Sequence, residues 1–269
     1  MGGMRRARLA DGTSVACLNA SEARVLDLHV DGYLDHGIAL ADDAVVLDVG
    51  ANIGLFGVRT VQRLPRARVF AFEPVPAIHA VASANAAEYG DGRMTVFDYG
   101  LSAAPGRLAF TYFPRCPALS TAHPEDWDEP GAFQAAVRGN LASARQATPL
   151  ARLVPGFMSP LLARWLTAAR EQVDAELKTV SQVIDEQGLT RVDLLKVDCE
   201  GAELEVLQGV RPEHWPLIGQ VVAEVHDLDG RLDAVRGLLE GHGFELVTER
   251  EAGFEATRLH NIFATRGPA

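Results

Sequence analysis

The sequence predicts an α/β fold: a mostly parallel sheet with helices on both faces. From residue 44 onward, short apolar runs rich in β-branched residues alternate with longer segments of helical spacing, which is the rhythm of βαβ units. Several of these runs end at a glycine or an acid, as is typical of the sheet edge where such folds bind ligands. The composition, 48% hydrophobic and 23% charged, is that of a globular protein, and 269 residues suffice for one large core.

The elements follow one another in this order. Strands are expected at residues 45–49, 68–72, 95–99, 106–113, 193–197 and 220–225, and residues 244–248 and 261–265 read as a closing pair of strands. Helices are expected at 53–63, 75–89, 180–188, 202–209 and 232–240, several of them flanked by the proline or glycine that starts or stops a helix. Residues 1–43 form an N-terminal lead-in, and 44–269 form the domain.

Residues from about 123 to 175 interrupt the alternation without an evident strand. A stretch of turn-forming residues is followed by two segments that are predicted to be helices, 131–145 and 160–176, with Pro149 and Pro155 between them. We expect a helical insertion over the carboxyl edge of the sheet, acting as a lid or in substrate recognition. The alternative is an insertion that only extends the core or contacts a second copy.

Charge and cysteine content narrow the classes of function. A formal net charge of −11 argues against the broad basic surface that non-specific nucleic-acid binding needs. No run of about 18 apolar residues predicts a membrane span, and residues 1–10 lack the apolar stretch of a secretory signal. Cys17, Cys116 and Cys199 have no paired spacing, which favours a reducing compartment over a disulfide frame or zinc site. We therefore expect a cytoplasmic protein without nucleic-acid or membrane partners, and the sequence leaves its oligomeric state open.

The first strand runs into a glycine-rich turn before a helix, where a ligand can approach the backbone closely. This turn does not have the G-x-G-x-x-G dinucleotide fingerprint, because Gly50 and Gly54 are separated by three residues. It is not a P-loop either, because no Lys-Ser/Thr pair follows Gly54. Asn tolerates left-handed backbone angles, so Asn52 takes a place that glycine would otherwise fill. The buried carboxylate of Asp48 must find donors in the turn or on a ligand. The residues of this turn expected to bind a ligand are Asp48, Gly50, Ala51, Asn52 and Gly54.

The second strand ends at Glu73 and Pro74, about 20 residues beyond Gly50, where an acid accepts the hydroxyls of a ribose. The third strand ends at Asp98, Tyr99 and Gly100, which we expect to face an adenine ring; Asp98 could equally cap the loop. Glycine turn and acid together predict a ligand of the adenosine type.

Three segments, VLDVGANIG at 46–54, FEP at 72–74 and LLKVDCEGAE at 194–203, resemble the FkbM family of S-adenosylmethionine-dependent methyltransferases. The likeness extends to Tyr33 before the sheet and to 261–263 near its end. It implies a class I methyltransferase fold with a seven-stranded sheet, and S-adenosylmethionine as cofactor with S-adenosylhomocysteine as product. It implies that the turn lies along the methionine part and that Glu73 holds the ribose. We add Tyr33 and Asp198 to the expected cofactor contacts. The stretch after Thr121 departs from the family pattern, so the acceptor stays open.

A second group of polar residues closes the next two strands. Asp198 and Glu200 follow one strand, and Glu224 and His226 end its neighbour on a single face. We expect His226 to take the proton of a hydroxyl acceptor, oriented by Asp198 or Glu224. Alternatively, these groups hold a divalent cation, or Glu200 only complements a helix dipole and His226 is a loop residue.

Acceptor contacts are expected from Lys196, Glu200, Ser120 and Thr121, with Lys196 either reaching the acceptor or pairing with Glu200. Cys199 lies beside two acids, which would raise the pKa of its thiol and make it a poor nucleophile.

The sequence thus predicts an O-methyltransferase that acts by in-line transfer with base assistance. The acceptor would be a hydroxyl of a secondary metabolite (polyketide, peptide or sugar moiety), free or bound to a carrier protein. Abundant Ala, Arg, Gly and Asp favour a bacterial source. The alternatives are an N-methyltransferase and a methyltransferase-like binding module without turnover; the glycine spacing disfavours a dehydrogenase.

Overall fold

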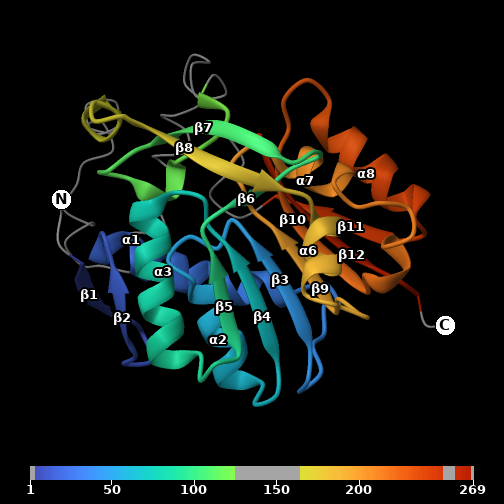
Figure 1. Cartoon of the computed structure of the whole chain (residues 1–269), viewed down its shortest axis with the longest axis horizontal. Coiled ribbons are helices and arrows are strands. Elements are labelled where there is room, and N and C mark those ends of the chain that lie inside the picture. The colour runs from blue at the N-terminus through green and yellow to red at the C-terminus, as the bar shows by residue number, and fades with distance from the viewer. Residues whose placement is uncertain (1–3, 125–163, 251–257, 268–269) are drawn as a thin grey trace.

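The computed structural model describes residues 4–124, 164–250 and 258–267, and a seven-stranded sheet lies at its centre (Figure 1). Only β12 runs antiparallel to its neighbours in that sheet; the other pairs are parallel. The predicted mostly parallel sheet is therefore confirmed. In spatial order, the strands are β11 (Glu245–Glu249), β12 (Leu259–Thr265), β10 (Gln220–His226), β9 (Leu194–Val197), β3 (Val45–Val49), β4 (Arg68–Phe72) and β5 (Met94–Phe97).

Helices cover both faces of this sheet, as predicted. Every residue of β3 is buried, and alternate side chains enter two different cores. Val46 shares one core with α2 (Leu55–Arg63) and α3 (Pro76–Tyr89). Leu47 shares the other core with α6 (Val180–Glu186), α7 (Glu203–Gln208) and α8 (Arg231–Gly241). Burial on both faces explains why the strand reads as a continuous apolar run.

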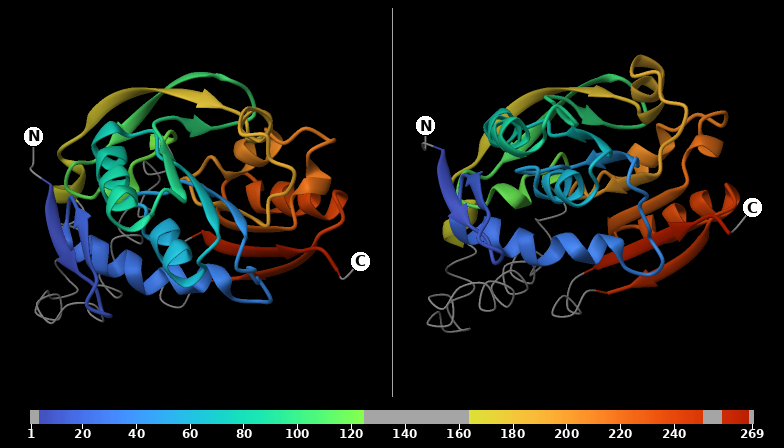
Figure 2. Two further views of the ribbon diagram at one scale, coloured as in Figure 1. Left: turned by 60° about the horizontal axis from the view of Figure 1, so that its bottom comes forward. Right: turned by 90° about the horizontal axis from the view of Figure 1, so that it is seen from below.

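The lead-in folds into elements that the sequence did not predict. A hairpin of β1 (Arg5–Arg8) and β2 (Ser14–Cys17) is followed by α1 (Ala20–His29) and the 3₁₀ helix η1 (Val30–Leu34). Figure 2 shows α1 running from the hairpin toward the closing strands of the sheet. Beyond η1, the ring centre of His36 lies 4.6 Å from that of Phe263 on β12. The lead-in therefore spans one face of the molecule and shares the core of α2 and α3.

Asn85 of α3 joins this lead-in to the glycine turn. Its fully buried amide nitrogen donates to the carbonyl oxygens of Ala16 (3.0 Å) and Ile53 (2.8 Å), and its oxygen accepts from the amide of Ala16 (2.8 Å). A buried amide side chain with all these bonds made fixes the position of both segments.

A three-stranded sheet of β6 (Gly100–Leu101), β8 (Glu171–Lys178) and β7 (Gly106–Tyr112) lies above the main sheet in Figure 1. The prediction of a helix over 160–176 is wrong for the part that forms β8. Ala175 and Leu177 are buried while Asp174 and Glu176 are exposed, which is the two-residue period of a strand. Pairing with β7 decides the conformation, and that partner is remote in sequence. The predicted helix at 131–145 lies outside the described residues.

Smaller differences concern where elements begin and end. Helix α2 starts at Leu55, two residues later than predicted, because Gly54 has a left-handed φ of 80°. Strand β5 ends at Phe97, and the chain then turns into β6.

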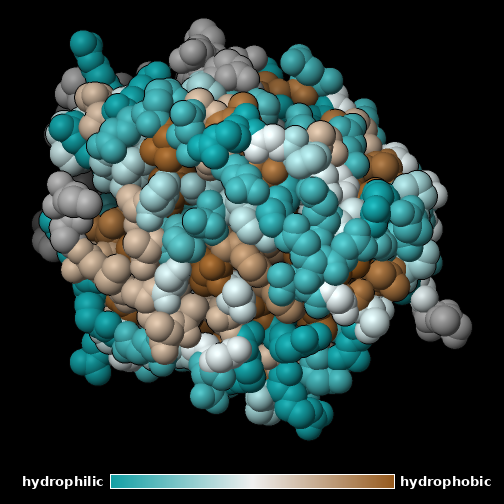
Figure 3. Space-filling model, in the orientation of Figure 1, coloured by the Kyte–Doolittle hydropathy of each residue, from teal (hydrophilic) through white to brown (hydrophobic). Residues whose placement is uncertain are grey.

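On the face of the molecule seen in Figure 3, hydrophilic residues predominate, and a pale brown area overlies the alanine-rich helix α3. Within the described ranges, no helix has the length and apolar character needed to cross a bilayer.

Arg59 offers a test of how the lead-in is held. Its side chain, 11% exposed, forms ion pairs with Asp11 and Asp27, both at 2.6 Å. We expect Arg59→Met to lower the free energy of unfolding in urea by about 3 kcal/mol, because two carboxylates lose their buried partner. The control is Arg63→Met on the same helix: its ion pair with Asp31 is exposed, so its loss should cost less than about 1 kcal/mol. Equal effects of the two substitutions would contradict this account.

Candidate active site

The turn after β3 depends on a close approach of two backbones. Gly50 has a φ of 73°, and a Cβ placed on it would lie 1.7 Å from the carbonyl oxygen of Asp198. Only glycine fits there. Asn52 has a φ of 50°, which confirms the predicted left-handed conformation, and its Oδ1 accepts from the amide of Ile53 at 2.8 Å. The turn is therefore locked against the end of β9.

Glu73 at the end of β4 lies against the same turn. Its carboxyl oxygens accept hydrogen bonds from the amides of Asn52 (3.1 Å) and Val75 (2.9 Å). Burial raises the pKa of Glu73 to about 8, although these two amides act in the opposite direction. The structure thus brings together the glycine turn and the acid that the sequence singled out, while a role of Glu73 in ribose binding stays a prediction. The adjoining Pro74 is half-buried.

Asp48 and Lys196 are directly opposed on the neighbouring strands β3 and β9. Lys196 Nζ lies 3.1 Å from Asp48 Oδ1 and 3.4 Å from Asp198 Oδ2, and it donates to the carbonyl oxygen of Gly50 at 3.2 Å. Burial alone would lower the pKa of Lys196, but the two aspartates outweigh burial and raise it. Lys196 is 2% exposed and Asp48 is fully buried. The expectation that Lys196 pairs with Glu200 is therefore wrong, and neither Lys196 nor Asp48 is open to solvent.

Tyr33 of η1 completes this group. Its hydroxyl donates to Asp198 Oδ2 at 2.7 Å, and Lys196 Nζ lies 5.0 Å from the centre of its ring. Burial raises the pKa of the Tyr33 hydroxyl well above 10, and the charges of Asp198 and Glu224 add to the effect. The structure thus brings the predicted residues Tyr33 and Asp198 into direct contact.

His226 lies between two glutamates. Its Nε2 is 3.3 Å from Glu200 Oε2, and its Nδ1 is 3.6 Å from Glu203 Oε1. Burial would lower the pKa of His226, but both carboxylates outweigh burial and hold that pKa well above 6.5, which favours the protonated ring. The prediction that Asp198 or Glu224 orients His226 is wrong: Glu200 and Glu203 do so.

Glu224 belongs to the group of carboxylates around Lys196, since its charge raises the pKa values of both Lys196 and Tyr33.

Two further acids, Glu203 and Glu22, are not among the site residues that the sequence predicts. Glu203 lies in the first turn of α7, is fully buried and accepts from the amide of Gly201 at 2.7 Å. Glu22 lies in the first turn of α1 and accepts from the amide of Ala118; burial raises the pKa of Glu22 to about 7, and Glu200 adds to this.

The predicted acceptor residues Ser120 and Thr121 bond to backbone. Thr121, 1% exposed, donates to the carbonyl oxygen of Glu200 (2.6 Å) and accepts from the amide of His123 (2.8 Å). Ser120 accepts from the amide of Phe113 at 3.2 Å. These bonds fasten the loop after β7 to the segment that carries Glu200.

Of the residues predicted to face an adenine, Asp98 is exposed, Gly100 is buried in β6, and Tyr99 is buried. The Tyr99 hydroxyl has no hydrogen bond within the part of the chain that the structure describes. Lys178 Nζ lies 4.7 Å from the centre of the Tyr99 ring. This arrangement leaves the adenine contact a prediction.

Burial raises the pKa of the Cys199 thiol well above 9, and Glu203 and Asp198 add to the effect. The raised pKa agrees with the expectation that Cys199 is a poor nucleophile, and burial is the larger cause of the shift.

In residues 4–124, 164–250 and 258–267, no three His, Cys, Asp or Glu side chains are grouped as metal ligands.

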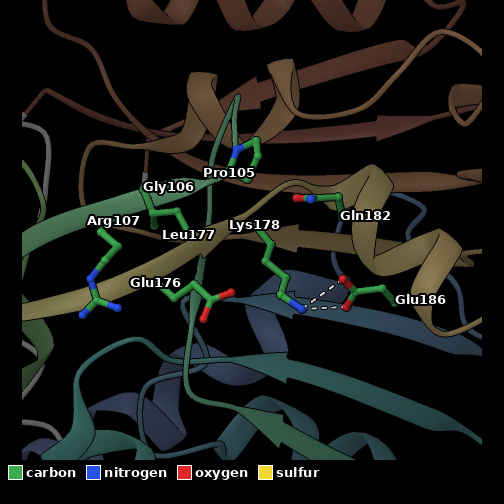
Figure 4. Close-up of a pocket in the computed structure, with 8 residues that line it drawn as sticks. All are labelled: Pro105, Gly106, Arg107, Glu176, Leu177, Lys178, Gln182 and Glu186. Carbon is green, nitrogen blue, oxygen red and sulfur yellow. Dashed lines mark hydrogen bonds and ion pairs between the residues drawn. The ribbon is translucent and has the colours of Figure 1, made fainter.

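A hollow of about 560 Å³ lies between β7, β8 and α6 (Figure 4). Within it, Lys178 Nζ donates to both carboxylate oxygens of Glu186, at 3.0 and 2.7 Å. None of the predicted site residues lines this hollow, so it is distinct from the candidate active site. Its lining residues are Pro105, Gly106, Arg107, Glu176, Leu177, Lys178, Gln182 and Glu186.

A seven-stranded sheet with one antiparallel strand, a glycine turn after β3 and an acid closing β4 define a Rossmann-like fold with its candidate ligand site at the carboxyl edge of the sheet. Comparison with known families identifies this fold as that of a methyltransferase, because the model of the methyltransferase FkbM domain matches residues 48–246. The chain belongs to the FkbM family of S-adenosylmethionine-dependent methyltransferases.

Individual proteins support this assignment. The chain is 37% identical over 266 residues to the 31-O-demethyl-FK506 methyltransferase FkbM of Streptomyces tacrolimicus, covering 96% of each chain. It is also 37% identical to part of the AMB antimetabolite synthetase AmbE of Pseudomonas aeruginosa, covering 96% of this chain but 12% of AmbE. The crystal structure of methyltransferase FkbM from Methylobacillus flagellatus KT has the same fold, with a TM-score of 0.51 and 15% identity over 95% of this chain and 56% of that one.

The pairing of His226 predicts how stability depends on pH. A histidine whose pKa is raised by folding contributes stability that is complete below the pKa of the free imidazole, about 6.5, and is lost as the pH rises through the folded-state value. We expect the difference in unfolding free energy between the wild type and His226→Gln to be largest at pH 6 and to shrink steadily toward pH 10. Urea denaturation at several pH values measures it, and a constant difference would contradict the assigned imidazolium.

Proposed function

We propose that this protein transfers a methyl group from S-adenosylmethionine to a hydroxyl group of a secondary metabolite. The observation that carries the hydroxyl acceptor is the 37% identity, over 96% of both chains, to an enzyme named for methylating the 31-oxygen of demethyl-FK506. The match to part of AmbE supports including acceptors that are held by a larger biosynthetic enzyme or a carrier protein.

The residues at the carboxyl edge of the sheet fit the donor. Gly50 and Asn52 are partly open in the turn, so backbone groups can be approached there. Asp198 is held through Oδ2 by Tyr33, and its carboxylate remains 22% exposed, which suits it to accept from an amino or hydroxyl group. Glu73 would accept from the ribose. When bound, the donor supplies a methyl group on a positively charged sulfur, and an acidic edge favours that charge.

The protein must then orient the hydroxyl and accept its proton. We propose that His226 takes part as a cation, because the carboxylates of Glu200 and Glu203, at 3.3 and 3.6 Å, favour the protonated ring. The proton of the hydroxyl would go to a nearby carboxylate. Glu22 and Glu200 are the candidates, since burial raises the pKa of each, that of Glu22 to about 7, close to the value that suits a general base.

Glu73 gives a test of the donor site. With a pKa of about 8 the carboxyl is mostly protonated at pH 7, and both the ribose hydroxyls and the sulfonium favour its ionised form. Binding of S-adenosylmethionine to the wild type should therefore release part of one proton per site at pH 7. Calorimetry in buffers of different ionisation enthalpy measures this release.

The variant Glu73→Gln should release no proton on binding and should lose about tenfold or more in affinity, the usual cost of an unpaired polar contact. Glu88→Gln is the matched control, because Glu88 is an exposed acid paired with Arg6, and it should behave as the wild type. A wild-type affinity that Glu73→Gln leaves unchanged would rule Glu73 out of the site.

The acceptor class is tested with methyl-labelled S-adenosylmethionine and candidate secondary metabolites, 31-O-demethyl-FK506 among them. Mass spectrometry and NMR of the products should show the label on oxygen. Transfer to nitrogen alone would favour the N-methyltransferase alternative, and donor binding without transfer to any acceptor would favour the binding module.

A further inference from the structure

The ammonium of Lys196 is a buried positive charge next to the place where a cationic cofactor is expected. It lies within 3.4 Å of a carboxylate oxygen on each of Asp48 and Asp198. Glu224 acts on the same ammonium, and Glu73 and Asp48 influence each other. Carboxylates thus outnumber the cation in this group, and the Asp48–Lys196 pair is its most deeply buried part.

Neither member of the pair can touch a ligand directly, because Asp48 is fully buried and Lys196 is 2% exposed. They act on a ligand through their charges and through what they hold. Lys196 holds the carbonyl oxygen of Gly50 and a carboxylate oxygen of Asp198, both of which line the turn. Because both side chains are buried, solvent screens their charges less than it screens charges at the surface.

The substrate and product of methyl transfer differ by one unit of charge at sulfur. S-adenosylmethionine is a sulfonium cation at that atom, whereas S-adenosylhomocysteine is a neutral thioether. The field of the protein at the sulfur therefore contributes to the affinity for the first and hardly to that for the second. A residue that sets this field therefore also determines how readily S-adenosylmethionine replaces bound S-adenosylhomocysteine in the site.

We propose that the Asp48–Lys196 ion pair sets the preference of the site for the cationic donor over its neutral product, by cancelling charge beneath the glycine turn. This proposal rests on the proposed function, in that the donor must occupy the turn. Lys196 is here a positioning and charge-balancing residue, with no contact to the donor.

A double-mutant cycle separates charge balance from contact. Asp48→Asn leaves Lys196 with one carboxylate fewer, which adds one net positive charge to the buried group. The preference for S-adenosylmethionine over S-adenosylhomocysteine, measured as the ratio of their Kd values by calorimetry, should fall about tenfold, as expected for a unit charge roughly 10 Å away at an effective dielectric constant near 20. The double variant Asp48→Asn with Lys196→Met removes both charges and should restore the wild-type ratio within about twofold.

The neutral product serves as an internal control, because its affinity reports the shape of the site without the charge effect. Should Asp48→Asn abolish binding of both ligands through misfolding, Asp48→Ser alone and with Lys196→Met provides the same cycle, since the smaller hydroxyl side chain is neutral and can still accept from Lys196. Asp185→Asn, which breaks an exposed pair with Arg211 at 2.6 Å, is the matched control and should leave the ratio unchanged.

Each result decides the matter. A lowered ratio that Lys196→Met restores supports the proposal. An unchanged ratio in Asp48→Asn, or a lowered ratio that persists in the double variant, overturns it while leaving the proposed function intact. Failure of the wild type to bind either ligand would overturn the proposed function and this inference with it.

Discussion

The contact between Gly50 and the carbonyl oxygen of Asp198 is the constraint on which the candidate active site depends. Because Gly50 has no Cβ, the ends of β3 and β9 approach more closely than any side chain would allow. That approach puts Asp48, Lys196 and Asp198 within ion-pairing distance. It also lets one ammonium bind both the turn and the carboxylate beside it. A larger residue at position 50 would separate the strand ends and disperse the charged group.

Acidic groups and their counter-charges are unevenly distributed along this edge. Around Lys196, several carboxylates surround one ammonium; around His226, two glutamates flank one imidazole ring. Lys196 is paired with Asp48 on the neighbouring strand β3 and with Asp198, which directly follows its own strand, whereas the partners of His226 lie more than 20 residues before it. The edge is therefore acidic overall yet internally compensated, which is how buried charges are tolerated in a folded protein.

The central part of the fold could be predicted because its signals are local. The apolar run of β3, the glycine turn and the acid after β4 are each readable within a few residues, and the turn and acid meet as expected. The sequence predicts a helix where β8 forms, because the strand conformation depends on pairing with β7, about 60 to 70 residues away. The partners of His226 were misassigned for a related reason: strand alternation placed Glu224 near it, but α7 turns Glu203 inward. Whether a side chain on a helix faces the sheet depends on packing that no short window contains.

The bond from Tyr33 to Asp198 means that the chain preceding the sheet helps to build the candidate active site. Asn85 provides a second link between the lead-in and the glycine turn, because it donates hydrogen bonds to the carbonyl oxygens of both Ala16 and Ile53. A domain excised at the start of β3 would keep every βα unit and still lack both of these supports. Where a related unit is grafted into or cut out of a multienzyme, the useful junction therefore lies before the hairpin at Arg5 and not at the first strand of the main sheet.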